Sequence, residues 1–151
     1  MTTKTARNLL IVGTGNVARS IMAEAYINAV ACGAWYAVSA GSKPAGKINP
    51  LTAITLAERD LRPTLRSKSW DEFTGPAAPI MDVVITVCEE AASEACPIWP
   101  GSPRMLHWPI PDPTTASGAL DERLETFRAV FAAIRGNVDR FLAEEASAAA
   151  A

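Results

Sequence analysis

The sequence predicts an α/β protein whose parallel sheet is covered by helices on both faces. Residues 9–12 form a continuous apolar run that ends at a glycine, as expected for a strand buried on both faces. Residues 81–87, MDVVITV, are dense in β-branched residues and give the strongest strand signal in the chain. Such strands alternate with segments of helical periodicity, an order typical of parallel sheets. We expect one domain over residues 1–145, followed by a disordered tail at 146–151.

The first half of the chain contains three further elements. A helix is expected from Ser20, because five apolar residues then recur on one face: Ile21, Met22, Ala25, Tyr26 and Ala29. Residues 35–39 form a short second strand, which ends at turn residues 41–44. Asn49 and Pro50 favour the start of a helix, since asparagine caps helices and proline suits the first helical position. We expect that helix to end near Asp60.

The second half of the chain predicts a weaker fourth strand over 104–108, a proline-rich loop and a long amphipathic helix over about 119–143. Acidic residues 121 and 122 are favourably placed in the first turn of that helix. Its expected apolar stripe is Leu120, Leu124, Phe127, Phe131, Ile134, Val138 and Phe141.

Bulk composition excludes several classes of function. Apolar residues make up 49% of the 151 residues, charged residues 20%, and the net charge is −2, so no basic field indicates nucleic-acid binding. No apolar run is long enough to cross a bilayer, and the first residues lack the apolar centre of a signal peptide. We therefore expect a cytoplasmic protein without a membrane partner. The only histidine, His107, has no neighbours at metal-ligand spacing, so we interpret it as structural and expect no metal.

The segment GTGNVARS, residues 13–20, is typical of a loop that holds a phosphate, and it fits two different motifs. One is the G-x-G-x-x-A fingerprint of dinucleotide-binding domains, formed by Gly13, Gly15 and Ala18. That motif requires an acidic residue about twenty positions further on, and none occurs between Glu24 and Glu58. Lys43 is an alternative partner, for a cofactor 2′-phosphate, but 151 residues leave little room for a full cofactor domain and a substrate domain. This interpretation is therefore the weaker one.

The second motif is the loop C-T-G-N-S-x-R-S, which this segment matches with glycine in place of cysteine. Further segments support it: YAVSAGSKPAGKINP, LRSKSWDEFTGPAAP, DVVITVCEEAASEACPIWPG and HWPIPDP. From about residue 8 to residue 142 the chain resembles the low-molecular-weight protein tyrosine phosphatase superfamily, and within it the arsenate reductase branch. That resemblance implies a flavodoxin-like, three-layer α/β/α fold with a four-stranded parallel sheet and the phosphate loop after the first strand.

The physical basis of such a loop is a turn of converging backbone N–H groups followed by the positive end of a helix. A tetrahedral oxyanion, such as phosphate, sulfate or arsenate, fits there. Arg19 is expected to complete the site with a bidentate fork. The expected oxyanion-binding residues are Gly13, Thr14, Gly15, Asn16, Val17, Ala18, Arg19 and Ser20.

The resemblance also implies roles for residues around the loop. Asn16 suits the left-handed backbone that the turn needs, and its side chain is expected to be held by Ser39. Ser20 is expected to cap the helix and to contact the nucleophile position. Asp112, within PDP, occupies the position of the phosphatases' general acid, although an aspartate between two prolines is also a common turn residue.

Cys88 and Cys96 match the redox pair of thiol-coupled arsenate reductases. In that scheme the loop cysteine attacks arsenate and forms a covalent adduct. The second cysteine displaces arsenite and forms a disulfide with the loop cysteine. The third cysteine then resolves this disulfide and leaves one that thioredoxin reduces. No cofactor is expected beyond a thioredoxin- or glutathione-type reductant, and that only if the pair is redox-active. Cys32 is expected to pack in the core or near the end of the first helix, without a role.

Gly13 stands at the nucleophile position and cannot attack a substrate. Losing a covalent nucleophile costs on the order of a millionfold in turnover in well-studied hydrolases. The family's loop serine is also changed, to Val17, and two linked departures favour natural divergence over an engineered inactive variant of an active arsenate reductase.

The leading hypothesis is therefore a catalytically silent member of this arsenic-resistance family that still binds an oxyanion, as a monomer or weak dimer. Two alternatives stay open: a thiol-dependent arsenate reductase that uses Cys88 and Cys96 with a reductant protein, and a module that docks a phosphorylated partner without hydrolysis.

Overall fold

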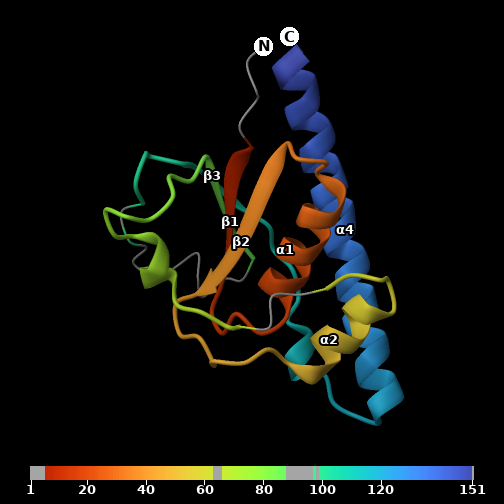
Figure 1. Cartoon of the computed structure of the whole chain (residues 1–151). Coiled ribbons are helices and arrows are strands. Elements are labelled where there is room, and N and C mark those ends of the chain that lie inside the picture. Colours follow the sequence, from red (N-terminus) through yellow and green to blue (C-terminus); the bar gives the residue numbers. More distant parts are fainter. Residues whose placement is uncertain (1–5, 63–65, 88–96, 98, 151) are drawn as a thin grey trace.

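The computed structural model describes residues 6–62, 66–87, 97 and 99–150. Its centre is a four-stranded sheet in the order β2-β1-β3-β4, and every neighbouring pair is parallel. The strands are β1 (Arg7–Gly13), β2 (Trp35–Gly41), β3 (Val83–Thr86) and β4 (Arg104–His107). The predicted parallel α/β fold is confirmed, with each strand within a few residues of its expected bounds. Figure 1 shows the strands beside the helices.

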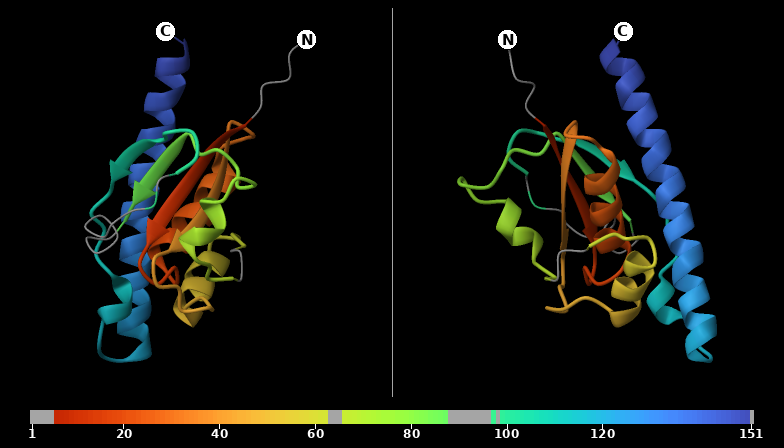
Figure 2. Two further views of the ribbon diagram at one scale, coloured as in Figure 1. Left: turned by 90° about the vertical axis from the view of Figure 1, so that its left-hand side faces the viewer. Right: turned by 45° about the vertical axis from the view of Figure 1, so that its right-hand side comes forward.

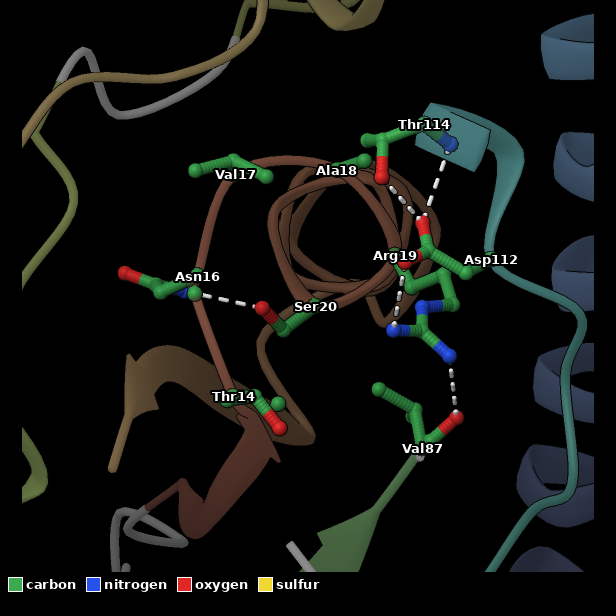
Figure 3. Close-up of a pocket in the computed structure, with 11 residues that line it drawn as sticks. Thr14, Asn16, Val17, Ala18, Arg19, Ser20, Val87, Asp112 and Thr114 are labelled. Atoms are coloured by element: carbon green, nitrogen blue, oxygen red, sulfur yellow. Dashed lines mark hydrogen bonds and ion pairs between the residues drawn. The ribbon is translucent and has the colours of Figure 1, made fainter. Parts of the chain in front are cut away.

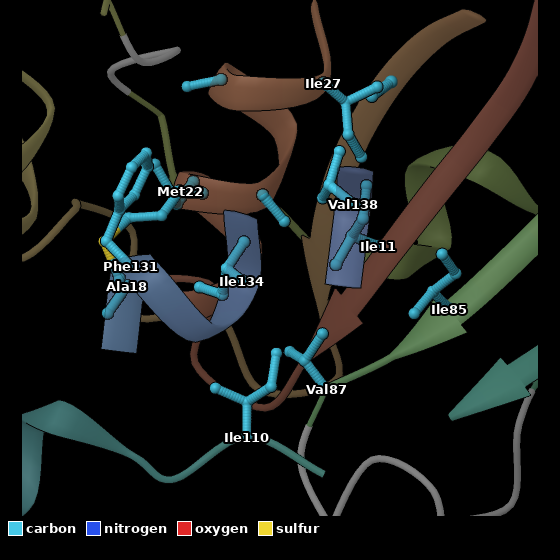
Figure 4. Close-up of a cluster of buried hydrophobic side chains, with 14 of the residues drawn as sticks. Ile11, Ala18, Met22, Ile27, Ile85, Val87, Ile110, Phe131, Ile134 and Val138 are labelled. Carbon is cyan, nitrogen blue, oxygen red and sulfur yellow. The ribbon is translucent and has the colours of Figure 1, made fainter. Parts of the chain in front are cut away.

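Three helices pack on one face of the sheet: α1 (Arg19–Val30), α2 (Pro50–Ala57) and α4 (Leu120–Ala150). Helix α1 lies between the sheet and α4 (Figure 1), so it is buried almost all round rather than along one stripe. Ile11 and Ile85 of the sheet meet Ile134 and Val138 of α4 in the core that Figure 4 shows. Asn49 caps α2 as expected, since its side chain accepts a hydrogen bond from the Leu51 N–H at 2.9 Å.

The opposite face of the sheet is covered, among the described residues, by a 3₁₀ turn, η1 (Trp70–Phe73), and by Trp99. Phe73 packs against Leu10, Val12 and Val84 on the strands. Figure 2 shows η1 on the side of the sheet away from α4. Both faces of the sheet are therefore covered, as the sequence predicts, but in the described part of the chain the α-helices lie on one face and a 3₁₀ turn lies on the other.

The last helix is longer than expected. We expect it to end near residue 143 before a disordered tail at 146–151, but α4 continues to Ala150. The extra residues are mostly alanine, which has the highest helix propensity and loses no side-chain entropy in a helix. At the other end Leu120 is 55% exposed, so it does not belong to the buried stripe. Ala29, expected on the buried face of α1, is also exposed.

Candidate functional site

A cavity of about 280 Å³ lies where β1 and β3 end. It is lined by residues 13–20, Val87, Asp112 and Thr114 (Figure 3). In the strand order, β2 lies on one side of β1 and β3 lies on the other, so the direction in which the chain crosses the sheet reverses at β1. Ligands of open parallel sheets bind outside the carboxyl ends of the strands at such a switch point. The structure thus brings the whole predicted loop and Asp112 to one cavity.

The carbonyl groups of the loop are held by residues outside it. Gly13 O accepts a hydrogen bond from Ser42 N at 3.2 Å, and Thr14 O accepts one from Lys43 N at 2.9 Å. Gly15 O and Val17 O accept bonds from Ala45 N and Asn49 N at 3.1 and 3.0 Å. Each C=O in a planar trans peptide is antiparallel to the following N–H. The N–H groups of residues 14, 15, 16 and 18 therefore point away from segment 42–49, to the side on which the cavity lies.

Gly41 allows this close approach between the loop and the end of β2. A Cβ at Gly41 would collide with the Thr14 carbonyl oxygen and would lie 3.1 Å from the Asn16 nitrogen. Gly41 pairs with Gly13 in the register of β1 and β2. The sequence predicts only a turn at Gly41, although a glycine at the end of the second strand is also a signal for a close backbone contact.

Asn16 has the left-handed conformation that the sequence predicts, with φ 52°. Its Nδ2 donates to Ser39 Oγ at 3.0 Å, as expected, and also to Ser20 Oγ at 2.8 Å (Figure 3). Its Oδ1 accepts a hydrogen bond from the Lys68 N–H at 2.9 Å. The buried side chain of Asn16 is therefore fixed from three directions, and with it the shape of the loop.

Ser20 does not cap α1, contrary to the expectation. The helix begins at Arg19, so Ser20 lies inside its first turn, and the N-cap residue Ala18 makes no side-chain hydrogen bond. The Ser20 hydroxyl accepts from Asn16 instead. It therefore supports the loop rather than the helix end.

A polar group that the sequence does not predict lies behind the loop and consists of Glu24, Ser67 and Lys68. All three residues are buried. Ser67 Oγ donates to Gly15 O at 2.9 Å, and Ser39 Oγ donates to Glu24 Oε1 at 3.2 Å. An acidic residue inside the apolar stretch of α1 was the signal for Glu24, whereas SKS has the composition of a solvated loop.

Arg19 lies at the wall of the cavity, with its side chain 14% exposed. Its Nη1 donates to the carbonyl oxygens of Val87 and Ile110 at 3.3 and 3.0 Å. Its Nη2 lies 3.6 Å from Asp112 Oδ2. The guanidinium is thus anchored beside the loop, while the fork on an oxyanion stays a prediction.

Asp112 is the N-cap of a short 3₁₀ turn, η2 (Pro113–Thr115). Its Oδ1 accepts hydrogen bonds from the Thr114 N–H at 2.9 Å and from the Thr114 hydroxyl at 2.7 Å (Figure 3). Asp112 is therefore both a turn residue and a residue of the site, because Oδ1 caps the turn while Oδ2 faces Arg19.

Gly13 ends β1 and has room for a side chain. A Cβ there would lie 3.4 Å from Ser20 Oγ and 3.7 Å from Val87 Cγ2, which are ordinary contact distances. No positive φ is involved. Neither the backbone conformation nor the space at Gly13 requires glycine.

Cys88 and Cys96 fall outside the described residues. Cys32 is exposed just after α1, so the expected core position is wrong and the position near the helix end is right. His107 Nδ1 lies 2.8 Å from Thr86 Oγ1. Within the described part of the chain, no cluster of three or more acidic, histidine or cysteine side chains has metal-binding geometry, and no helix is apolar and long enough to span a bilayer.

Comparisons with known proteins agree on one family. A family model described as low molecular weight phosphotyrosine protein phosphatase matches residues 8–149. Arsenate reductase of Halalkalibacterium halodurans is 31% identical over 117 residues, which are 78% of this chain and 81% of that protein. The crystal structure of arsenate reductase from Archaeoglobus fulgidus is 31% identical, covers 89% of this chain and 98% of its own, and superposes with a TM-score of 0.71. A solved arsenate reductase in the phosphate binding state shares the fold at 22% identity and a TM-score of 0.70, covering 91% of this chain and 98% of its own.

Proposed function

Because the chain belongs to the low molecular weight phosphotyrosine protein phosphatase family, we propose that its loop binds an inorganic oxyanion, phosphate, sulfate or arsenate, without forming a covalent bond to it. The observation that carries this proposal is the direction of the loop peptides. Four loop carbonyls are bonded to segment 42–49, so the opposite N–H groups point to the cavity at the start of α1. Convergent N–H groups and a helix N-terminus together attract a tetrahedral anion.

The absence of a side chain at Gly13 supports binding rather than catalysis. In the resemblance, position 13 holds the thiolate that attacks the substrate, and glycine has no nucleophilic atom. A thiolate also repels a dianion, by several kcal/mol at ordinary protein dielectrics and contact distances. A loop without the thiolate keeps the N–H donors and loses that repulsion, which favours capture of the anion.

Relatives support the ligand class. Arsenate reductases are among the similar proteins in both the sequence and the structure comparisons, and one protein of the same fold has been solved in a phosphate binding state. We propose the same class of ligand here, with arsenate and phosphate as equal candidates because their geometry and charge are alike. The cavity, about 280 Å³, has room for one such anion and ordered water.

Thermal unfolding in a series of anions tests this function. Sulfate, phosphate and arsenate at millimolar concentration are expected to raise the Tm over chloride at matched ionic strength, because a ligand of the folded state stabilises it by mass action. Hydrolysis of p-nitrophenyl phosphate by the same preparation is expected to stay at the uncatalysed rate. A Tm that does not respond to any of the three anions would contradict the proposal, and rapid hydrolysis would contradict its non-covalent form.

A further inference from the structure

A closed set of buried contacts lies behind the oxyanion loop and joins Asn16 to a lysine–glutamate pair. Lys68 Nζ lies 3.7 Å from Glu24 Oε1, and the two side chains are only 6% and 4% exposed. Glu24 accepts from Ser39, and Ser39 accepts from the Asn16 amide. The Lys68 N–H returns to Asn16 Oδ1 at 2.9 Å. Residue 68 therefore holds Asn16 twice, directly through its backbone and indirectly through its ammonium.

The geometry of this pair does not suit a contact that serves stability alone. Charge-assisted N–H···O bonds are usually about 2.7–2.9 Å long, whereas the ammonium lies 3.7 Å from Glu24 and 3.5 Å from the Arg66 carbonyl oxygen. Burial of two charges costs several kcal/mol per ion, which such a pair recovers only with good geometry. Its evident effect is to cancel two charges close to a loop that binds an anion.

We propose that Lys68 is a positioning residue of the oxyanion loop, which neutralises Glu24 and holds Asn16 in its left-handed conformation. The inference rests on the proposed function, because it assigns a source of that site's affinity. Glu24 alone would place a negative charge behind the loop and oppose the bound anion. With Lys68 present, Ser39 keeps its acceptor at Glu24 and Asn16 keeps its acceptor at Ser39, while the net charge of the Lys68–Glu24 pair is zero.

A titration with sulfate tests this charge balance, because sulfate keeps its two charges at all pH values near neutrality. Lys68→Met leaves a net negative charge and is expected to weaken sulfate binding, on the order of tenfold. Glu24→Gln leaves a positive charge and is expected to strengthen it, while the double variant returns to about the wild-type Kd. The exposed Lys47→Met serves as the matched control, with a change of less than about twofold.

The opposite signs of the two single variants separate electrostatics from packing. If Lys68 only filled space, both single variants would bind more weakly and the double variant would be weaker still. That result would overturn the inference while leaving the oxyanion function intact.

The thermal stability of the wild type, the two single variants and the double variant, measured without anion, gives a second, independent test. Each single variant leaves one buried charge alone, so its Tm is expected to fall by about 5–10 °C, and the double variant is expected to recover much of that loss. If wild-type protein bound no sulfate, the proposed function would fail, and this cycle would still decide the Lys68–Glu24 coupling. If the Tm loss of the double variant equalled the sum of the two single losses, the inference would be overturned. If Lys68→Met did not fold but the double variant did, that result would support the inference. If neither Lys68→Met nor the double variant folded, the inference would be contradicted.

Discussion

The guanidinium of Arg19 lies 3.6 Å from the carboxylate of Asp112, and both residues line the cavity that the oxyanion loop borders. An anion that reaches the loop meets this carboxylate as a competitor for Arg19. Asp112→Asn is therefore expected to strengthen binding of sulfate by about tenfold, because it removes one negative charge near the ligand. Asparagine still caps η2, so the turn is kept. Asp121→Asn, on an exposed residue of α4, is the control, and unchanged or weaker binding in Asp112→Asn would contradict the competition.

Gly13→Cys tests whether the loop still supports a nucleophile. An added Cβ makes only ordinary contacts with Ser20 and Val87, and a thiol there lies close to the N-terminus of α1, which favours the thiolate. We expect residue 13 to react with iodoacetamide at pH 7 faster than the exposed Cys32 of the same chain, as followed by peptide mass spectrometry. Sulfate is expected to slow the reaction at residue 13 alone. Gly13→Ala controls for the added carbon, and equal rates at residues 13 and 32 would count against an intact loop.

Gly41 and Gly136 offer a matched pair of glycine substitutions. Gly41→Ala is expected to lower the free energy of unfolding by about 1–3 kcal/mol, because its Cβ collides with loop backbone. Gly136→Ala, with open space around it inside α4, is expected to raise that free energy by about 0.5–1 kcal/mol. Urea unfolding measures both. Similar effects at the two sites would show that the close approach of β2 to the loop is unimportant.

Glu145 connects α4 to the sheet through Arg104 and Arg7. The hydrogen bond from Arg104, and the weaker one from Arg7, hold the pKa of the Glu145 carboxyl below its usual value. Because the folded-state pKa is lowered, the stabilisation is present above about pH 4.5 and is lost as the pH falls through the folded pKa. Glu145→Gln is therefore expected to cost about 1–3 kcal/mol at pH 7 and little near pH 3. Glu144→Gln, at the exposed neighbouring position, is the control in urea titrations at several pH values, and a loss that does not depend on pH would contradict this assignment.

The parts of the site that follow from local pattern are the parts that the sequence predicts. Strand β1, the loop and the start of α1 are contiguous, so periodicity and turn chemistry are enough to place Gly13 and Asn16. The Ser39 contact and the approach of Asp112 to the loop come from the family resemblance, which carries long-range information that one sequence lacks.

The parts that were missed depend on tertiary packing. Lys68 looks like a surface residue in SKS, and its burial results from the bridge between Gly41 and Ser69 that draws this segment over the loop. The helical structure of residues 144–150 is not predicted for another reason. This alanine-rich end has high helix propensity, but it lacks the alternation of polar and apolar residues that marks the rest of α4 as helical. The sequence predicts the cap at Ser20, two residues after the actual N-cap, Ala18, because helical periodicity is evident only from Ser20 onward.

Calorimetric titration with arsenate tests the central claim most directly, with Arg19→Ala and the exposed Arg140→Ala as the pair of variants. We expect wild type and Arg140→Ala to bind one arsenate per chain with the same affinity, and Arg19→Ala to bind at least about 100-fold more weakly, because a charge-assisted fork is lost. Absence of heat in the wild type at millimolar arsenate, or equal binding by Arg19→Ala, would contradict an oxyanion site in this loop.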